Sequence, residues 1–320
     1  MGRKLLIFGN GLGMALDPQH FSLTRALESV WEIDELLTPE QKQLICRCVN
    51  HDGAPEGEHE LDLLHLAVTS CESLGKIGGG RVHWLSEEGQ KFPVMTARYI
   101  HKVATDLHNY DGELPAGFVS PLVDFVKDTK SHVATLNYDK LLYSSLIDND
   151  IFNGYGGYLV DGMTVNQGFS EDNLERLYDR DFGYYLHLHG SPLFVNNGNK
   201  ITKLSRDKLT INSDFIGRHI VLTHVEHKPK VIAASEALSA YWNYLRFAIS
   251  EIDEVVLFGY SGLDKHLNYL IRPYTKHILV KVVEWSGTGE FGQRQRYWKN
   301  ELGEKTKLIH LDNVLEFTDW

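Results

Sequence analysis

Four short segments, far apart in the chain, each lie at the end of a run that reads as a β-strand. They cover residues 8–13, 135–139, 187–190 and 258–264. In an open parallel α/β sheet the carboxyl ends of the strands meet along one edge, and that edge lines the ligand crevice. The four segments therefore predict the walls of one pocket, and a dinucleotide is long enough to touch several strand ends at once.

Short apolar runs alternate with helical patterns along the rest of the chain. The runs that read as strands cover residues 4–8, 132–136, 184–189, 254–258, 277–284 and 307–311. Apolar residues at helical spacing mark residues 236–250, 264–272 and about 294–302. Alternating strands and helices favour a parallel sheet covered on both faces. We therefore predict an α/β fold, a Rossmann-like parallel sheet.

A long stretch between the first two strands carries helical patterns only. It runs from about 20 to 125 and shows no strand of comparable strength. One helix start is clear, because Thr38 is a capping residue, Pro39 suits the first turn and Gln41 is placed to close a capping box. We expect a large helical insertion within a single domain spanning 1–320. Since the insertion follows the first glycine cluster, it is placed to cover the pocket or to form a subunit contact.

Composition and charge exclude several classes of protein. Of the 320 residues, 42% are apolar and 23% charged, as in an ordinary soluble globular protein. A net charge of −11 without a basic patch argues against nucleic-acid binding. No apolar stretch reaches the ~18 residues of a membrane span, and the opening Met-Gly-Arg-Lys leads into a strand rather than a signal peptide. We expect a cytoplasmic protein with no membrane partner.

The first glycine cluster predicts a phosphate-binding turn. It consists of Gly9, Asn10, Gly11, Leu12 and Gly13. Glycines let the backbone approach a pyrophosphate closely, and the next helix presents free amides to the anion. Because the spacing is not the full G-x-G-x-x-G pattern, a tight strand-to-helix turn without a ligand stays open.

Two polar residues follow the second strand. The Asn137 side chain has a donor and an acceptor, so it can position a sugar hydroxyl or a water. Asp139 is expected to order the loop or to cap the helix that begins at Lys140. For both residues the alternative is a plain Asx cap on a strand-to-helix turn.

Two histidines, His187 and His189, lie two residues apart on an expected strand and should point to the same face. His189 precedes Gly190, where the chain must turn, and is a candidate acid–base group near neutral pH. Buried, hydrogen-bonded histidines are one alternative. A metal site with His224 and His227 is another, but that spacing matches no common zinc module, so we expect no metal.

The loop after the strand at 254–258 offers a second close backbone approach at Gly259 and Tyr260. Ser261 adds a hydroxyl, and Asp264 can cap the next helix or hold the loop. Glu284 and Trp285 end the following strand, where a ribose diol or an adenine face can be held. The alternative for this loop is an ordinary capped helix start.

Taken in this order, the four segments resemble the sirtuin-like superfamily. That family carries a glycine loop after its first strand, an Asn-x-Asp loop, a catalytic His-Gly and a Gly-x-Ser loop. Here these fall on the glycine cluster, Asn137-Tyr138-Asp139, His189-Gly190 and Gly259-Tyr260-Ser261. Leu-His-Gly-Ser together with Gly-Tyr-Ser-x-x-Asp looks most like the bacterial sirtuin-like NAD hydrolases of antiphage defence. The helical insertion has no recognisable counterpart.

The chain also departs from the protein-deacylating sirtuins. Those carry a four-cysteine zinc module after the catalytic histidine, whereas the cysteines here are Cys46, Cys48 and Cys71. The resemblance therefore implies NAD binding without implying an acyl-lysine groove. Asn10 also stands where the deacylases usually carry Ala, so the contacts of the glycine loop are expected to differ.

The resemblance implies hydrolysis of NAD at the nicotinamide–ribose bond, with NAD as substrate and no cofactor required. It implies that Asn137 holds the water or the ribose and that His189 orients or deprotonates a ribose hydroxyl. Two alternatives stay open: a non-hydrolytic sensor of NAD or ADP-ribose, and a protein ADP-ribosyltransferase. Because an unregulated NAD hydrolase would be toxic to its host, we expect a homo-oligomer or control by a defence-system partner such as an ATPase.

Overall fold

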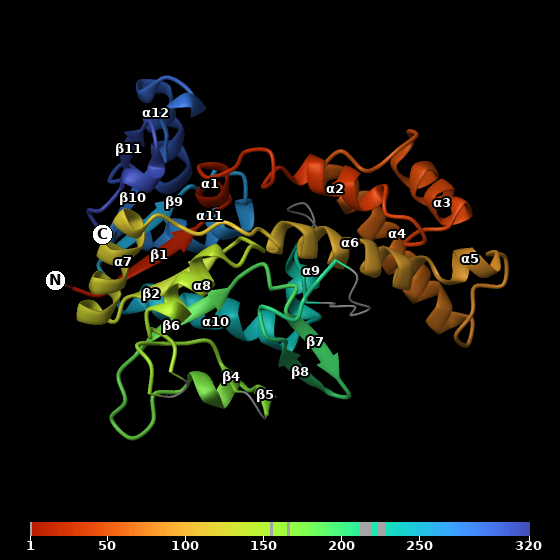
Figure 1. Cartoon of the computed structure of the whole chain (residues 1–320), viewed down its shortest axis with the longest axis horizontal. Coiled ribbons are helices and arrows are strands. Elements are labelled where there is room, and N and C mark those ends of the chain that lie inside the picture. The colour runs from red at the N-terminus through yellow and green to blue at the C-terminus, as the bar shows by residue number, and fades with distance from the viewer. Residues whose placement is uncertain (1, 154–155, 165–166, 212–218, 223–227) are drawn as a thin grey trace.

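The protein is built around one parallel sheet, seen in a computed structural model that describes residues 2–153, 156–164, 167–211, 219–222 and 228–320 (Figure 1). The strands are β1 (Lys4–Phe8), β2 (His132–Thr135), β3 (Leu159–Val160), β6 (Gly183–His187), β9 (Glu254–Phe258), β10 (Leu279–Trp285) and β11 (Lys307–Leu311). Their order is β11-β10-β9-β1-β2-β6-β3, and every pairing is parallel. The predicted α/β fold with a Rossmann-like sheet is confirmed.

The strand order locates the crevice of the sheet. The chain leaves β1 to form β2 on one side and later returns to place β9 on the other. Phe8 at the end of β1 is paired in register with Phe258 at the end of β9, so the two loops that follow start side by side. Such a topological switch point is where open α/β sheets bind their ligands.

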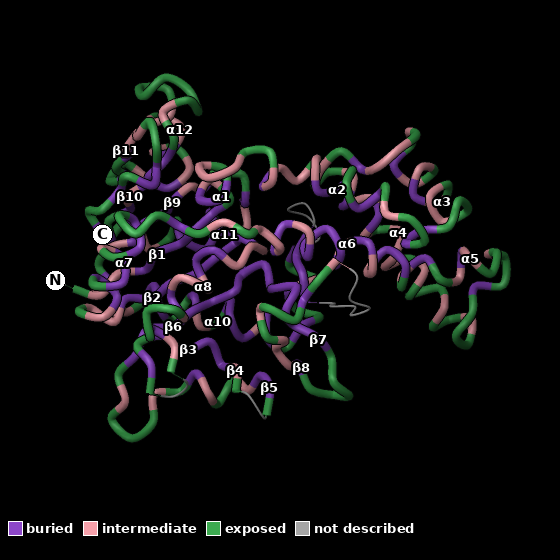
Figure 2. Tube along the Cα trace, in the orientation of Figure 1, coloured by how far each residue is buried: buried purple, intermediate pink, exposed green. Residues whose placement is uncertain are grey.

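Helices cover the two faces of the sheet because the apolar side chains of each strand alternate. In β1, Leu5 and Ile7 join one core cluster and Leu6 and Phe8 join the other. The first face is covered by α10 (Glu236–Ser250), α11 (Lys265–Ile271) and α12 (Phe291–Leu302), and the second by α7 (Ala116–Thr129), α8 (Leu141–Asp148) and the C-terminal residues. Figure 2 shows the strands running through the buried part of the molecule.

A helical block with its own core extends from the carboxyl edge of the sheet (Figure 1). Its elements are α2 (Leu23–Trp31), α3 (Pro39–Val49), α4 (Glu58–Ile77), α5 (Glu87–Gln90) and α6 (Phe92–His108). The predicted capping box is present, since the Thr38 hydroxyl accepts from Gln41 N and the Gln41 side chain accepts from Thr38 N. Helix α7 begins within the 20–125 stretch, but its apolar side chains join the sheet core rather than this block.

Shorter elements complete the described chain. They are α1 (Gly11–Met14), the hairpin of β4 (Met163–Thr164) and β5 (Gly168–Phe169), the hairpin of β7 (Phe194–Asn197) and β8 (Lys200–Lys203), α9 (Lys228–Ala233), and the 3-10 turns η1 (Glu171–Leu174), η2 (Arg272–Lys276), η3 (Ser286–Thr288) and η4 (Val314–Glu316). Among the described residues, no helix combines the length and apolar character that a membrane span needs.

The expected strand over 184–189 is too long. Strand β6 ends at His187, so His189 lies beyond the strand and the alternation of faces does not extend to it. The chain turns at Gly190, which has a φ of +80°. A Cβ on Gly190 would also overlap the carbonyl oxygen of His219, so this turn requires glycine.

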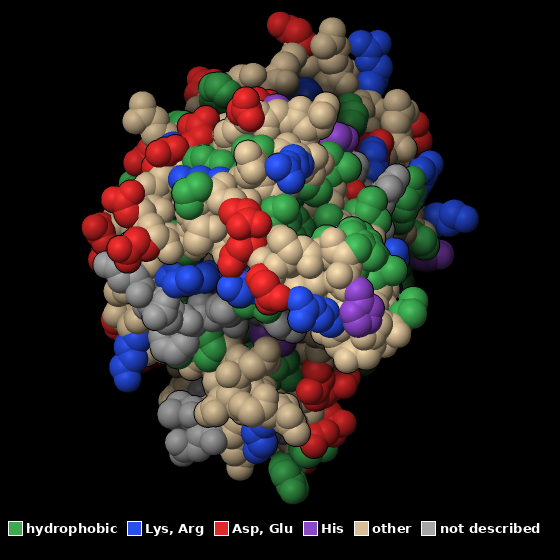
Figure 3. All heavy atoms as spheres, turned by 90° about the vertical axis from the view of Figure 1, so that its right-hand side faces the viewer, with side chains coloured by type: hydrophobic (Ala, Val, Ile, Leu, Met, Phe, Trp, Pro, Cys, Tyr) green, Lys and Arg blue, Asp and Glu red, His purple; other side chains and the backbone are tan. Residues whose placement is uncertain are grey.

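The end of the helical block away from the sheet exposes large apolar side chains. Ile77 at the end of α4 is 85% exposed and Trp84 is 75% exposed. Leu66 in the middle of α4 and Val94 at the start of α6 are also exposed. Figure 3, which views the molecule from this end, shows hydrophobic side chains set among charged ones.

Candidate functional site

One cavity of about 810 Å³ brings the four predicted segments together at the carboxyl ends of the strands. That volume lies within the range of small-molecule sites, about 300–1,000 Å³. The predicted site residues that line the cavity are Gly9, Asn10, Gly11, Asn137, Asp139, His189, Gly259, Tyr260, Ser261, Asp264 and Glu284. Leu12 and Gly13 are buried and do not line the cavity. Trp285, expected to hold an adenine face, stands at the same cavity and is 57% exposed.

The glycines of the two loops are required by the contact between the loops themselves. A Cβ on Gly11 would lie 2.6 Å from the Cα of Gly259, and one on Gly9 would lie 2.7 Å from the Gly259 carbonyl oxygen. Gly259 has a φ of +59°, a conformation that glycine adopts without cost. Gly13 has a separate reason, since its Cβ would meet the ring of Phe21. Close packing of the chain is therefore sufficient to explain these glycines.

The expectation of free amides at the start of the first helix is wrong for two of them. Helix α1 is a single turn of four residues. Gly11 N donates to Gly259 O at 2.8 Å, and Leu12 N donates to Gly9 O at 3.1 Å. These amides already have partners, so the loop is a weaker anion site than the glycine pattern suggests.

Asn137 is buried, and only one of the two polar atoms of its side chain has a hydrogen-bond partner among the described residues. Its Nδ2 donates to the Gly9 carbonyl at 3.0 Å, and its backbone N donates to the Thr135 hydroxyl at 3.0 Å. Its Oδ1 is buried and has no hydrogen-bond partner among the described residues. A buried acceptor without a partner costs about 1–3 kcal/mol. An incoming hydroxyl or water that donates to this oxygen would recover that energy.

Asp139 orders the turn just before α8, whose N-cap is Lys140 without a side-chain cap bond, so the loop-ordering function expected for it fits and the capping function does not. Its Oδ1 accepts from Leu141 N at 2.9 Å, at the start of α8. Burial raises the pKa of this carboxyl to about 6, although the hydrogen bonds from backbone amides act to lower it.

The most polar part of the cavity is a buried group of three charged or titratable side chains. His189 Nε2 and Lys228 Nζ each lie 3.0 Å from the same oxygen, Oδ2 of Asp264. The other oxygen of Asp264, Oδ1, accepts from His266 N at 3.1 Å and Leu267 N at 3.2 Å. The predicted capping of the next helix by Asp264 is therefore confirmed, and this carboxylate also holds the histidine.

These contacts settle which nitrogen of His189 carries the proton. Burial opposes ionisation of Asp264, but the hydrogen bond from His189 and the charge of Lys228 hold its pKa well below the usual range. An ionised carboxylate only accepts hydrogen bonds, so Nε2 of His189 must be the donor. Burial, with Lys228 adding to it and Asp264 opposing it, lowers the pKa of His189. The ring is therefore neutral near pH 7, and Nδ1 is left with a lone pair to accept a proton.

Glu284 has little acceptor capacity left for a ribose diol. Its two oxygens accept from Thr288 Oγ1, Arg294 Nε and Nη2, Trp298 Nε1 and His310 Nε2. A carboxylate offers about four lone-pair sites. Glu284 therefore ties α12 and β11 to the end of β10, and the ribose function expected for it has no free oxygen. Tyr260 is likewise occupied, since its hydroxyl bonds to Asp264 O and Asn268 Oδ1, both at 2.9 Å.

Sequence reasoning missed several residues that line the cavity. Lys228 begins α9, and the helical block contributes Leu23 of α2, Glu58 of α4 and Leu107 of α6. The block therefore covers one side of the cavity, as its position after the glycine loop suggested. A lysine near His224 and His227 gave a weak signal, but nothing in the spacing places Lys228 beside Asp264.

His187, the other histidine expected on that strand, is not part of the site. His187 does not line the cavity, and its ring packs among Tyr143, Tyr185 and Phe194. His224 and His227 lie outside the described residues. Within the ranges described, no group of three His, Cys, Asp or Glu side chains is placed to hold a metal ion.

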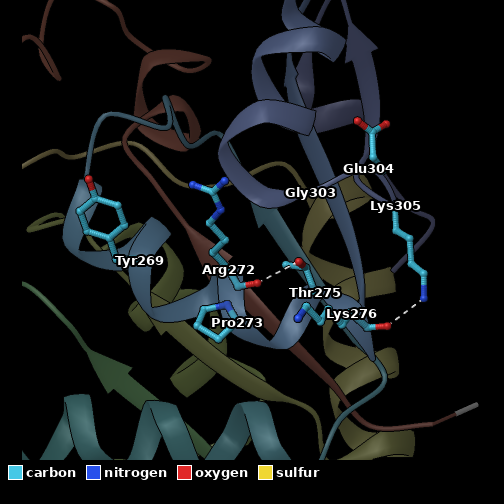
Figure 4. Close-up of a pocket in the computed structure, with 8 residues that line it drawn as sticks. All are labelled: Tyr269, Arg272, Pro273, Thr275, Lys276, Gly303, Glu304 and Lys305. Atoms are coloured by element: carbon cyan, nitrogen blue, oxygen red, sulfur yellow. Dashed lines mark hydrogen bonds between the residues drawn. The ribbon is translucent and has the colours of Figure 1, made fainter.

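A second hollow of about 510 Å³ lies away from the predicted segments, between η2 and the loop after α12 (Figure 4). Arg272, Lys276 and Lys305 are exposed around it. Lys305 Nζ donates to Lys276 O, and the Thr275 hydroxyl donates to Arg272 O, both at 2.9 Å. No predicted site residue lines this hollow.

Comparison with known proteins adds little. No protein-family model matches the chain, and no curated protein matches its sequence. A solved structure described as "Structural Basis for the Mechanism and Regulation of Sir2 Enzymes" is similar, with a TM-score of 0.39 and 9% identity over 98% of this chain and 88% of that one. A likeness of this strength carries no argument about activity.

Proposed function

We propose that this protein hydrolyses NAD at the nicotinamide–ribose bond. The observation that carries the proposal is the pairing of Asn137 and His189 in one cavity at the switch point of the sheet. One supplies a buried oxygen without a partner, and the other a neutral imidazole with a lone pair at Nδ1. The resemblance of the four motifs to the sirtuin-like family supports the choice of NAD as the dinucleotide.

The proposed reaction needs only water as its second reactant. The bond between ribose C1′ and the nicotinamide nitrogen breaks, and its electron pair leaves with neutral nicotinamide. The oxygen of water forms a new bond to C1′, giving ADP-ribose, and the proton released passes by way of His189 to solvent. The sugar passes through an oxocarbenium-like state, so acceptors near the ribose hydroxyls and the water stabilise it.

The buried acceptor and base suit this chemistry. Asn137 Oδ1 is proposed to accept from the water or a ribose hydroxyl. His189 Nδ1 is proposed to accept a proton from the same groups. The loops at Gly9–Gly13 and Gly259–Ser261 are proposed to flank the phosphates, and exposed Trp285 to meet the adenine. We do not assign the ribose diol to Glu284, because its oxygens are occupied.

The direct experiment measures nicotinamide release from NAD by the purified protein. His189→Ala and Asn137→Ala should each lose activity by ~10²–10⁴, the range for a positioned acid–base group. His277→Ala and Asn243→Ala are matched controls, because both residues are exposed and do not line the cavity. Full activity in either site variant would remove that residue from the mechanism.

The products separate the alternatives. Stoichiometric ADP-ribose with unlabelled protein supports hydrolysis, whereas label transferred from NAD to protein indicates an ADP-ribosyltransferase. Saturable NAD binding without nicotinamide release indicates a sensor. Because no step uses a metal, treatment with a chelator should leave the rate unchanged.

We further propose that the activity lowers cellular NAD in antiphage defence and is controlled by a homo-oligomer or a partner such as an ATPase. Two features support control through the helical block: it lines one side of the cavity, and its far end exposes Ile77 and Trp84. Under activating conditions, the wild-type chain should lower NAD and stop growth in cells, and His189→Ala should do neither. Constant NAD during a wild-type growth arrest would refute the hydrolase proposal.

A further inference from the structure

Lys228 is a buried lysine beside the proposed base. Its side chain is only 3% exposed, and Asp264 is its only hydrogen-bond partner among the described residues. It is also the one lysine or arginine among the described residues that line the cavity. A buried ammonium is costly unless it is paired, so its position beside His189 calls for a physical explanation.

The geometry couples Lys228 to His189 through one atom. Both Nζ of Lys228 and Nε2 of His189 lie 3.0 Å from Oδ2 of Asp264. The ammonium is therefore within about 6 Å of the ring nitrogen, a distance at which a charge shifts a neighbour's pKa by about one to three units. Without that cation, no nearby positive charge would offset the negative charge of Asp264, which favours the protonated imidazole.

We propose that Lys228 is a positioning residue for His189: by sharing Oδ2 of Asp264, its charge keeps the imidazole in the neutral form with the proton on Nε2. The function of Nδ1 as a base depends on this form, and the catalytic part of the proposal rests on the proposed NAD hydrolysis. The Asp264 charge is divided between the two donors, so the carboxylate orients the ring without drawing a second proton onto it.

Other groups that face His189 do not replace Lys228. Tyr138 packs near its ring at 6.4 Å between centroids, Glu58 of α4 raises the pKa of His189, and His266 of α11 lies close enough for the two histidines to interact. Of these, Glu58 favours the protonated ring. Burial and Lys228 act in the opposite direction.

The test is a titration of the His189 ring by NMR with isotope-labelled histidine, its signal assigned by its loss in His189→Ala. In the wild type, the midpoint should lie below the ordinary value of about 6.5. In Lys228→Met it should rise by at least about one unit. Lys228→Arg, which keeps the charge, should restore the low midpoint. Lys230→Met is the matched control, since Lys230 is exposed on the same helix.

The pH profile of nicotinamide release supplies a second readout. In Lys228→Met, the midpoint of the acidic limb of the kcat/KM profile should move to higher pH by the same number of pH units as the midpoint of the ring titration. The activity should therefore drop about tenfold or more near pH 6 and recover at high pH, because one pKa unit is a tenfold change in the fraction of base. A residue that only supported the fold would lower activity equally at all pH values.

Two results would overturn the proposal. One is a wild-type midpoint at or above 6.5, and the other is a Lys228→Met midpoint equal to that of the wild type. If Lys228→Met fails to fold, Lys228→Gln carries the same comparison, and the wild-type midpoint needs no variant. The titration does not depend on NAD, so a shifted midpoint in a protein that releases no nicotinamide would refute the hydrolase while leaving the coupling intact.

Discussion

Replacing Asp264 with Asn should destabilise the protein more than any other single isosteric change in the cavity. The carboxylate accepts four hydrogen bonds, two from α11 amides and two from the buried side chains of His189 and Lys228. In Asp264→Asn the helix cap can persist through Oδ1. The atom that replaces Oδ2 becomes a donor amide that faces two other donors, and the buried Lys228 ammonium loses its counter-charge.

Breaking a buried ion pair by removing one partner costs about 3–5 kcal/mol. Against a typical stability of about 5–15 kcal/mol, that is a large fraction of the total. Urea unfolding at pH 7.5 measures the difference directly. Asp148→Asn is the matched control, since Asp148 pairs with Arg206 at 2.5 Å but is 56% exposed, and an exposed pair contributes about 0–1 kcal/mol. Equal decreases in the free energy of unfolding in the two variants would refute the conclusion that Asp264 stabilises the fold through a buried ion pair.

The double variant Asp264→Asn with Lys228→Met sharpens the argument. Removing both charges eliminates the unpaired ammonium, and replacement of a whole buried pair is often close to neutral. The double variant should therefore lose less stability than the two single losses added together.

Because the pKa of Asp264 is lowered by folding, its contribution to stability is present above its unfolded pKa of about 3.9 and is lost as the pH falls toward the folded value. The gap between wild type and Asp264→Asn should thus hold from pH 7.5 to 5.5 and narrow at lower pH.

Three further perturbations have defined outcomes. Gly259→Ala should lower the free energy of unfolding, measured in urea, by more than about 2 kcal/mol, because Ala is strained at a φ of +59° and its Cβ would lie 2.8 Å from Leu12 N. Gly292→Ala is the control: a Cβ at this position in α12 meets no atom within 4 Å, so the free energy of unfolding should rise by up to about 1 kcal/mol. Burial lowers the pKa values of His108 and His132 to about 4. The free energy of unfolding should therefore fall as the pH drops from 6.5 to 4, by up to about 1.4 kcal/mol per pH unit for each histidine. A urea midpoint that stays constant over that range would contradict their burial as neutral rings. Trp285→Ala should raise the KM for NAD about tenfold with little change in kcat if an adenine stacks on the indole, whereas Phe291→Ala, exposed but outside the cavity, should leave both unchanged.

The features that the sequence predicts correctly are those determined by local pattern. Strand β1 is an apolar run followed by glycines, and the capping box at Thr38 is a four-residue signal. Both depend on neighbours within a few positions, and tertiary packing does not have to be known. The convergence of the four segments in one cavity follows from a general rule, that parallel strands end along the same edge.

The same local patterns mislead where a contact comes from elsewhere in the chain. The glycines at Gly9 and Gly11 read as a phosphate turn, yet the structure shows that Gly259 packs on them. Glu284 reads as a free carboxylate at a strand end, yet α12 and β11 supply it with donors. In both cases the partner lies far away in the sequence, so no spacing within the motif reveals that these groups already have partners within the chain.

Lys228 is the clearest case of a residue that pattern cannot identify. Its side chain is charged, and a charged residue at a helix start is normally exposed. Its burial is explained only by Asp264, which lies on a different helix 36 positions later. The same carboxylate was visible in the sequence as a helix cap, and that function is correct but incomplete. One oxygen of Asp264 satisfies the helix and the other arranges the cavity, so the chemistry of His189 depends on a contact that only the folded chain brings together.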